Sequence, residues 1–538
     1  MNTRKIFKVA VIALLSYVLL SWVLPLCIDI FGGEAPAVQI GLVPAFLAFV
    51  ETFTGFGNTF VYIVLVGVFY AVLKASGQYD AIVNKIVNKL RGSEKLFIIS
   101  TIVIMTIISS IVGLDLGLLI VFPLLISVVL RLGYDKFVAL STAVVPVAIG
   151  TFGATFASTN YGVTNSILGL SMSDGLIFKA ILLVLGIAFT IAYVLLYIKK
   201  NNFKLNAEEI KEERKTLFTS IILIVLFVIF LLGTISWGSI YTNNIFEKAH
   251  EAVMGVTVGN FDVFNKLFGG VAAFGSWNTP YRFEYYSVLL LIVTFIIAIV
   301  KKVKKDDFFN AVVEGIKEYI VYALLAMIAL AVFVFAYYYP IIQTVQTWLL
   351  GLTKEFNVAI GAIYSIISGI VYPDYYYYAY YVVGSMGTTF PDAANVASII
   401  STALYGVLIL MAPTSVILLI SLALTDTRYG EWVKYIWKLV LALVVSALIV
   451  MLIAANVTAN PALNVKVIYD VVLALLAIAI VVLIVIFIKR SREVKKVEVK
   501  ATKEKQEAKK VNTKAKEIKT TKKTTNKKTA TKKTTKKH

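Results

Sequence analysis

Long runs of apolar residues dominate the hydrophobic pattern of this chain. A helix needs about 17–25 mostly apolar residues to cross a hydrocarbon core about 30 Å thick. Because backbone N–H and C=O groups find no water in that core, runs of this length form helices rather than strands. About a dozen runs qualify, roughly residues 6–26, 57–73, 96–112, 116–130, 137–157, 176–198, 217–236, 285–300, 319–339, 393–412, 432–455 and 467–488. The pattern predicts an all-α polytopic membrane protein of about 10–14 transmembrane helices.

The overall composition supports this class. Of 538 residues, 59% are hydrophobic and 15% are charged, whereas a soluble domain is about 45–50% apolar and about 25% charged. We therefore expect a multi-pass protein of the cytoplasmic membrane whose main partner is the lipid bilayer.

The net charge of +20 is concentrated at the C-terminus, where residues 489–538 hold 21 Lys and Arg against 5 Glu. This Lys- and Thr-rich segment is almost without apolar residues, so it cannot bury enough surface to fold. We expect a disordered cytoplasmic tail near anionic lipid, where each Lys contributes about 1 kcal/mol. No nucleic acid is then needed to explain the charge, and binding of the tail to another macromolecule is the alternative.

Basic residues beside the apolar runs predict the topology, since Lys and Arg accumulate on the cytoplasmic side. They place both termini in the cytoplasm and the polar stretch 238–284 outside. The first run is too long for the apolar part of a signal peptide, so we expect it to be kept as a span. The expected segments are N-terminal helices 1–95, a first repeat core 96–200, connecting helices 201–318, a second repeat core 319–455, a last helix 456–488 and the tail 489–538.

Common catalytic motifs are missing from the sequence. It has no phosphate-binding loop of the G-x-x-x-x-G-K-[ST] type, and its two histidines, His250 and His538, cannot form a zinc motif. Cys27 is the single cysteine, which excludes a cysteine metal cluster. We predict that the protein is not an enzyme and has no cofactor apart from a coupling Na⁺ or H⁺. A channel and a membrane-embedded enzyme built on carboxylates are the alternatives.

Polar interruptions of the apolar runs recur in the two halves of the chain. Gly113 precedes the triplet Ser158-Thr159-Asn160 by 45 residues, and Gly369 precedes Pro413-Thr414-Ser415 by 44. Breaks at matching places in two halves are typical of a transporter whose half-helix ends face substrate or ion near the midplane. The alternative is that these small residues serve only close helix packing.

The two breaks supply the candidate site residues. Intramembrane carboxylates are costly and often functional, so we weigh Asp115 and Asp374 as ligands against solvated helix ends. Asp392 follows Pro391 and is expected to cap a helix. The substrate-binding candidates are Ser158, Thr159, Asn160, Asn165, Pro413, Thr414, Ser415, Asp115 and Asp374, with a sodium ion near Gly153, Asn160 and Thr414.

Several short segments resemble a known family, the YfcC and anaerobic four-carbon-dicarboxylate (DcuC-like) carriers of the ion transporter superfamily. The resemblance implies two inverted repeats, each with a re-entrant hairpin whose tip binds substrate and a coupling cation. This chain departs from the family pattern at Leu114-Asp115-Leu116 and at Asn160-Tyr161. The matching segments are Gly67-Val68-Phe69-Tyr70, Gly77-Gln78-Tyr79-Asp80, Leu132-Gly133-Tyr134-Asp135, Ala412-Pro413-Thr414-Ser415 and Tyr429-Gly430-Glu431-Trp432.

These observations together predict a cation-coupled secondary active transporter of a small polar organic solute. For a dicarboxylate, hydroxyls, amides and helix N-termini at the tips would hold the carboxylate oxygens. For a cationic amino acid, Asp115 and Asp374 would supply the counter-charge instead. The sequence leaves this choice open, and it also leaves open whether the protein forms a homodimer.

Overall fold

The computed structural model describes residues 3–31, 39–113, 116–203, 205, 210, 212, 214–240, 245–268, 275, 277 and 282–459. The chain divides into two compact units, Met1–Val472 and Leu473–His538, and all described residues belong to the first. The expected span at 467–488 and the tail at 489–538 lie outside the described residues.

The described residues are almost entirely helical, which confirms the predicted all-α membrane class. Among them, nine helices are long and apolar enough to cross a membrane. The span of α1 continues to Cys27, and that of α19 begins at Pro391. The nine are α1 (Thr3–Val23), α2 (Leu42–Ala75), α4 (Glu94–Val112), α8 (Leu176–Asn201), α9 (Leu217–Thr234), α13 (Arg282–Val300), α14 (Lys305–Tyr338), α19 (Ala394–Ile409) and α21 (Tyr429–Ala459).

Shorter elements connect these helices. Two of them, η3 and η5, are single π-helical turns, and β1 pairs with β2 in an antiparallel hairpin. They are η1 (Leu24–Phe31), α3 (Gln78–Leu90), η2 (Leu116–Ile120), α5 (Phe122–Arg131), α6 (Lys136–Phe152), η3 (Ser158–Gly162), α7 (Val163–Ile167), α10 (Trp237–Ile240), α11 (Ile245–Met254), β1 (Thr257–Val258), β2 (Phe261–Asp262), α12 (Val263–Phe268), α15 (Ile341–Gly351), α16 (Val358–Val371), α17 (Tyr375–Tyr378), η5 (Ala379–Val383), α18 (Gly384–Thr389), η6 (Pro391–Ala393) and α20 (Val416–Leu424).

Two expected spans are shorter than their apolar runs. The run 116–130 is not one helix, because Pro123 lacks an N–H and lies in the first turn of the 10-residue helix α5. The run 137–157 ends as a helix at Phe152, where Gly153 caps α6. Hydrophobicity alone did not distinguish these broken segments from full spans.

The predicted repeat is visible in the order of the elements. In the first half, α4 is followed by a break, α6, a second break and α8; in the second half, α16, α19 and α21 follow the same order. In each half the first helix packs on the second and the second on the third. The two halves meet where α6 packs on α19, and a Cβ on Gly406 would lie 2.4 Å from the backbone nitrogen of Phe152. Only a glycine permits this close approach.

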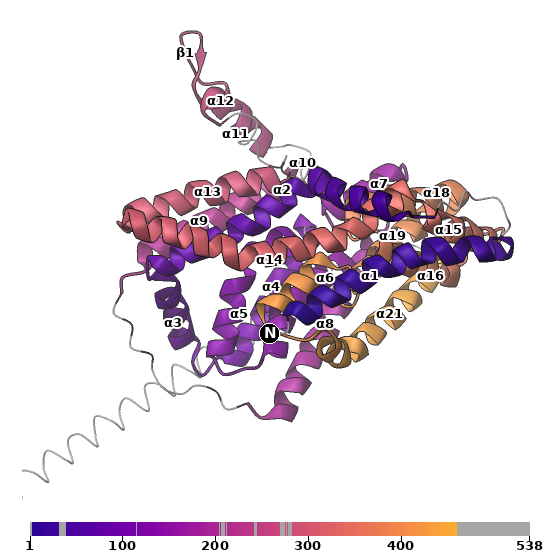
Figure 1. The fold of residues 1–538 in the computed structure, drawn as a ribbon, viewed down its shortest axis with the longest axis horizontal. Coiled ribbons are helices and arrows are strands. Elements are labelled where there is room, and N and C mark those ends of the chain that lie inside the picture. The colour runs from indigo at the N-terminus through magenta and orange to yellow at the C-terminus, as the bar shows by residue number, and fades with distance from the viewer. Residues whose placement is uncertain are drawn as a thin grey trace, which may run out of the picture. The chain divides into compact units, whose positions relative to one another are not determined.

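Outside the repeats, α2 and α14 run side by side (Figure 1). Each has 34 residues, which at 1.5 Å per residue is about 50 Å and exceeds the membrane core. The backbone of α2 leaves helical geometry at Phe56 (φ −119°, ψ 21°), between Gly55 and Gly57. Glycines are a common cause of such kinks, and this one opens α2 toward a cavity described below.

Candidate functional site: two helix breaks and two buried cations

The first break lies where α4 ends. Gly113 adopts φ +73°, a left-handed conformation that favours glycine. A Cβ at this position would lie 2.4 Å from the Cβ of Ala157. The hydroxyl of Thr159 donates a 3.2 Å hydrogen bond to the carbonyl of Val112, the last residue of α4. Thr159 therefore satisfies one of the carbonyls that the end of a helix leaves unpaired.

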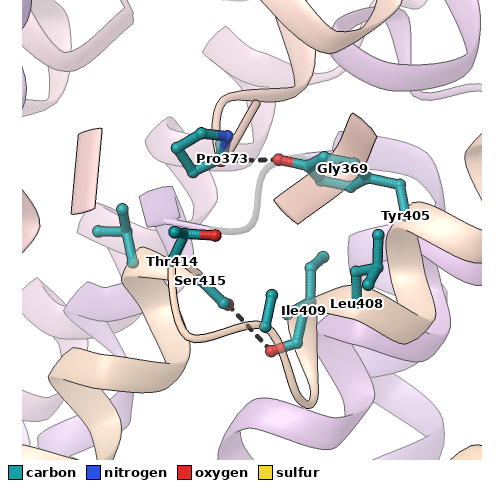
Figure 2. A pocket seen from close by; sticks show the side chains of 9 residues that line it. Gly369, Pro373, Tyr405, Leu408, Ile409, Thr414 and Ser415 are labelled. Carbon is teal, nitrogen blue, oxygen red and sulfur yellow. Dashed lines mark hydrogen bonds between the residues drawn. The ribbon is translucent and has the colours of Figure 1, made fainter. Parts of the chain in front are cut away.

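The second break repeats this contact. The hydroxyl of Thr414 donates a 2.6 Å hydrogen bond to the carbonyl of Ile370, one residue before the end of α16. Beside it, the Tyr405 hydroxyl donates to the carbonyl of Pro373 over 2.7 Å, as Figure 2 shows. A cavity of about 10 Å³ lies among these groups, which is room for about one water-sized species.

Side chains also satisfy the carbonyls at the end of α19. Three consecutive residues there would otherwise leave buried acceptors unpaired, which is costly in a membrane. Ser415 donates to the carbonyl of Ile409 over 2.9 Å (Figure 2), Trp432 donates to Leu410 over 2.8 Å, and Tyr429 donates to Met411. The second tip is thus held in place by side-chain donors from two neighbouring segments.

Hydrogen bonds connect the first tip to the second repeat. Asn165 in α7 is 1% exposed and accepts a 2.6 Å hydrogen bond from Ser398 in α19. The hydroxyl of Thr164 lies 2.9 Å from that of Tyr375, which donates to Thr402 over 3.0 Å. All these side chains are buried. The two repeats therefore share one polar network in the protein interior.

One buried basic residue lies beside the first tip. Lys179, in the first turn of α8, is 0% exposed, and its ammonium nitrogen has no hydrogen-bond partner in the structure. The ammonium is 4.2 Å from the ring centre of Tyr161, which is also buried. A cation–π contact supplies about 0.5–2 kcal/mol, less than a buried charge loses on leaving water. Lys179 therefore requires an anion when it is charged.

A second buried cation pairs with a predicted site residue. Arg282, at the start of α13, lies 3.7 Å from the carboxylate of Asp374, and the two side chains are 10% and 17% exposed. The other carboxylate oxygen of Asp374 caps α17, accepting from the backbone N–H groups of Tyr376 (3.0 Å) and Tyr377 (3.5 Å). Asp374 is thus a helix cap with a cation beside it.

A family model described as "C4-dicarboxylate anaerobic carrier" (DcuC) matches residues 43–375, which is more than half of the chain. The chain belongs to this family. The match extends from the start of α2 to the first residue of α17, and so includes the whole first repeat and both buried cations. Its family and the apolar helices described above make the chain a multi-pass membrane protein.

Two further proteins are similar to this DcuC-family chain. An uncharacterized protein of Haemophilus influenzae is 27% identical over 143 residues, which are 27% of this chain and 28% of that protein. The match thus spans less than a third of that relative. The crystal structure of the Alcanivorax borkumensis YdaH transporter, reported to have an unusual topology, is similar with a TM-score of 0.37 and 12% identity, covering 85% of this chain and 98% of that one.

The structure describes most, but not all, of the predicted site residues of this DcuC-family chain. Asp115 lies outside the described residues, as do the side chains of Ser158 and Asn160. Gly153 accepts a 3.0 Å hydrogen bond from Ser110 and packs so closely on the backbone of Leu183 that a Cβ would lie 2.5 Å from it. No described group of three or more His, Cys, Asp and Glu side chains forms a metal site.

The cap predicted at Asp392 is wrong, because α19 begins one residue later with Ala393 as its N-cap and no side-chain hydrogen bond. Sequence reasoning also missed both buried cations. Lys179 lies near the start of the expected span 176–198 and Arg282 shortly before the expected span 285–300, so they look like ordinary interfacial residues. Arg282 was assigned to the expected external stretch. Only packing shows that both are buried.

Proposed function

We propose that this DcuC-family chain is a secondary active carrier of a C4-dicarboxylate, and that substrate and a coupling cation bind at the two hairpin tips. The observation that carries the proposal is Lys179, whose buried amine has no hydrogen-bond partner beside the first tip. A dianionic substrate would hold this amine in its protonated form by neutralising the charge. The family description names the same class of substrate.

The buried charges favour an anionic substrate over a cationic amino acid. A cationic substrate would use carboxylates as counter-charges, but Asp374 caps α17 and lies 3.7 Å from the guanidinium of Arg282, which would repel a cation. A protonated Lys179 would repel a cation. The hydroxyls of Thr159 and Thr414 donate their single protons to helix-end carbonyls, and their oxygen lone pairs would ligate a coupling cation beside the substrate. The substrate would also stabilise the protein, because it completes interactions that the apo protein lacks.

The coupling ion and the orientation belong to this proposal. The 10 Å³ cavity beside Thr414 has room for one monatomic ion, and a sodium ion there would balance part of the substrate charge. A proton is the alternative, and the two differ in whether transport requires sodium at constant pH. The basic flanks of the spans support cytoplasmic termini.

Thermal unfolding of the purified protein with a ligand panel tests the proposed substrate. We expect succinate to raise the melting temperature, with a stabilisation of about 2.7 kcal/mol at a hundredfold excess over Kd. Lysine and alanine should leave it unchanged. A rise in melting temperature with lysine and none with succinate would contradict the proposal and would favour a cationic amino acid as the substrate.

A further inference from the structure

A polar cavity distinct from the small cavity of Figure 2 lies beside the kink of α2, and Pro373 and Asp374, adjacent in the chain, line the one and the other. The cavity beside the kink has a volume of about 210 Å³. Sites for drug-sized ligands are about 300–1,000 Å³, so this cavity suits a smaller molecule such as a four-carbon acid. It is lined by Gly55, Phe56, Asn58, Thr59, Arg282, Phe283, Asp374, Tyr376 and Tyr377.

Arg282 and Asp374 lie close together in this cavity, but their side chains are not joined by a hydrogen bond. Guanidinium nitrogen and carboxylate oxygen are 3.7 Å apart, beyond ordinary hydrogen-bond length. The Nε of Arg282 is buried and has no hydrogen-bond partner in the structure. A guanidinium has five N–H donors and binds a carboxylate best through two parallel hydrogen bonds. Arg282 lines the cavity, and its guanidinium carries more donors than its 3.7 Å contact with Asp374 uses.

Asp374 is fixed in place by its second role. Because its Oδ1 caps α17, the carboxylate cannot approach Arg282 without giving up the cap. The next residue, Tyr375, bonds to Thr164 of the first repeat. The cavity therefore adjoins the polar network that connects the two repeats.

We propose that Arg282 is a carboxylate-binding residue of the transport pathway, and that a substrate carboxylate replaces Asp374 as the partner of its guanidinium. The proposal rests on the proposed function and adds a second anion subsite to it. Asp374 keeps Arg282 charged and oriented while the cavity is empty, and its own negative charge must weaken anion binding. The two residues of one ion pair then have opposite effects on substrate affinity.

Three variants test whether Arg282 and Asp374 have opposite effects on substrate affinity. Succinate binding is measured by calorimetry on the purified full-length protein. Arg282→Gln should weaken binding by about tenfold or more, the usual effect of losing a charged hydrogen-bond donor. Asp374→Asn should bind succinate as tightly as wild type or more tightly, because asparagine caps helices as well as aspartate does. Lys317→Gln removes a cation from an exposed ion pair with Glu314 and should change nothing.

A purely structural ion pair predicts a different result. Arg282→Gln and Asp374→Asn would then weaken binding equally, or neither would change it, and either outcome overturns the proposal. Arginine labelling of the wild-type protein with phenylglyoxal needs no variant and gives a second measurement if Arg282→Gln does not fold. Succinate should protect Arg282 from labelling, as read by mass spectrometry. Full labelling of Arg282 at saturating succinate would also overturn the proposal.

Failure of the subsite and failure of the proposed function are distinguishable. If wild type binds succinate but Arg282→Gln binds it equally well, the carrier proposal stands and the subsite is wrong. If wild type does not bind succinate but glutamate protects Arg282 from labelling, the carboxylate subsite stands and the C4-dicarboxylate proposal is wrong. If neither acid protects Arg282, the subsite is wrong.

Discussion

The ammonium of Lys179 lies 4.2 Å from the ring centre of Tyr161, and both side chains are buried beside the first hairpin tip. The aromatic face compensates only part of the free energy that the ammonium loses on leaving water. An anionic substrate would supply the rest. In the proposed function, the contact relates the packing of α8 on the tip to the charge of the substrate.

Replacing Lys179 by Met should abolish succinate binding without lowering the stability of the apo protein. Met keeps the length of the side chain but removes a buried amine that has no hydrogen-bond partner, so the apo protein should unfold at the same or a higher temperature. The succinate-dependent rise in melting temperature should disappear. Lys317→Met, at an exposed ion pair, is the control that keeps this rise. A normal rise in Lys179→Met would show that Lys179 does not bind the substrate.

The tip threonines should matter for ligand binding more than for folding. Thr159→Ala and Thr414→Ala each lose one hydrogen bond to a helix-end carbonyl, which costs about 1 kcal/mol of unfolding free energy. Each variant should lose most of the succinate-dependent stabilisation. Thr294→Ala loses a comparable bond inside α13 and should keep it. If all three variants respond to succinate alike, the tips are only structural.

Alanine substitution of two glycines with similar backbone conformations tests how tightly the first tip must pack. Gly113 and Gly92 have φ values of +73° and +76°, but a Cβ on Gly92 has nothing within 4 Å. Gly92→Ala should cost about 1–2 kcal/mol of unfolding free energy through its backbone conformation alone. Gly113→Ala should cost clearly more and reduce transport, because its Cβ meets Ala157 and Thr159. Equal melting temperatures would mean that the tip adapts to the extra atom.

Removal of the C-terminal tail should not affect transport. A chain that ends at Arg492 loses most of the +16 charge of residues 489–538 but keeps every described residue. We expect the same uptake rate per molecule in the membrane. Lower uptake at equal abundance would assign the tail a role in transport.

The fold class and the repeat were predictable from the sequence. The fold class follows from the length of the apolar runs, and the repeat follows from the matched spacing of the helix breaks. Apolar runs long enough to cross a membrane must be helical, and the matched breaks at Gly113 and Gly369 led to the two tips. The exact spans were less predictable, since Pro123 divides a run that hydropathy reads as continuous. The helix α16 was also missed, although it carries the second break.

The site was predictable only where it coincides with a break in a helix. Thr159 and Thr414 lie at such breaks, and the structure shows that they make matching hydrogen bonds. Lys179 and Arg282 were not predictable, because charge in a sequence does not reveal burial. The role of Asp374 needed the position of Arg282, which comes from a distant helix.

Uptake of labelled succinate into liposomes that contain only this protein tests the central claim most directly. A carrier exposes its site to one side at a time, so we predict saturable uptake that becomes faster when the liposomes contain unlabelled succinate. Lys179→Met should abolish it at equal protein content. Uptake that rises linearly with concentration would indicate a channel. No succinate uptake, with saturable exchange of lysine in the same liposomes, would contradict the account.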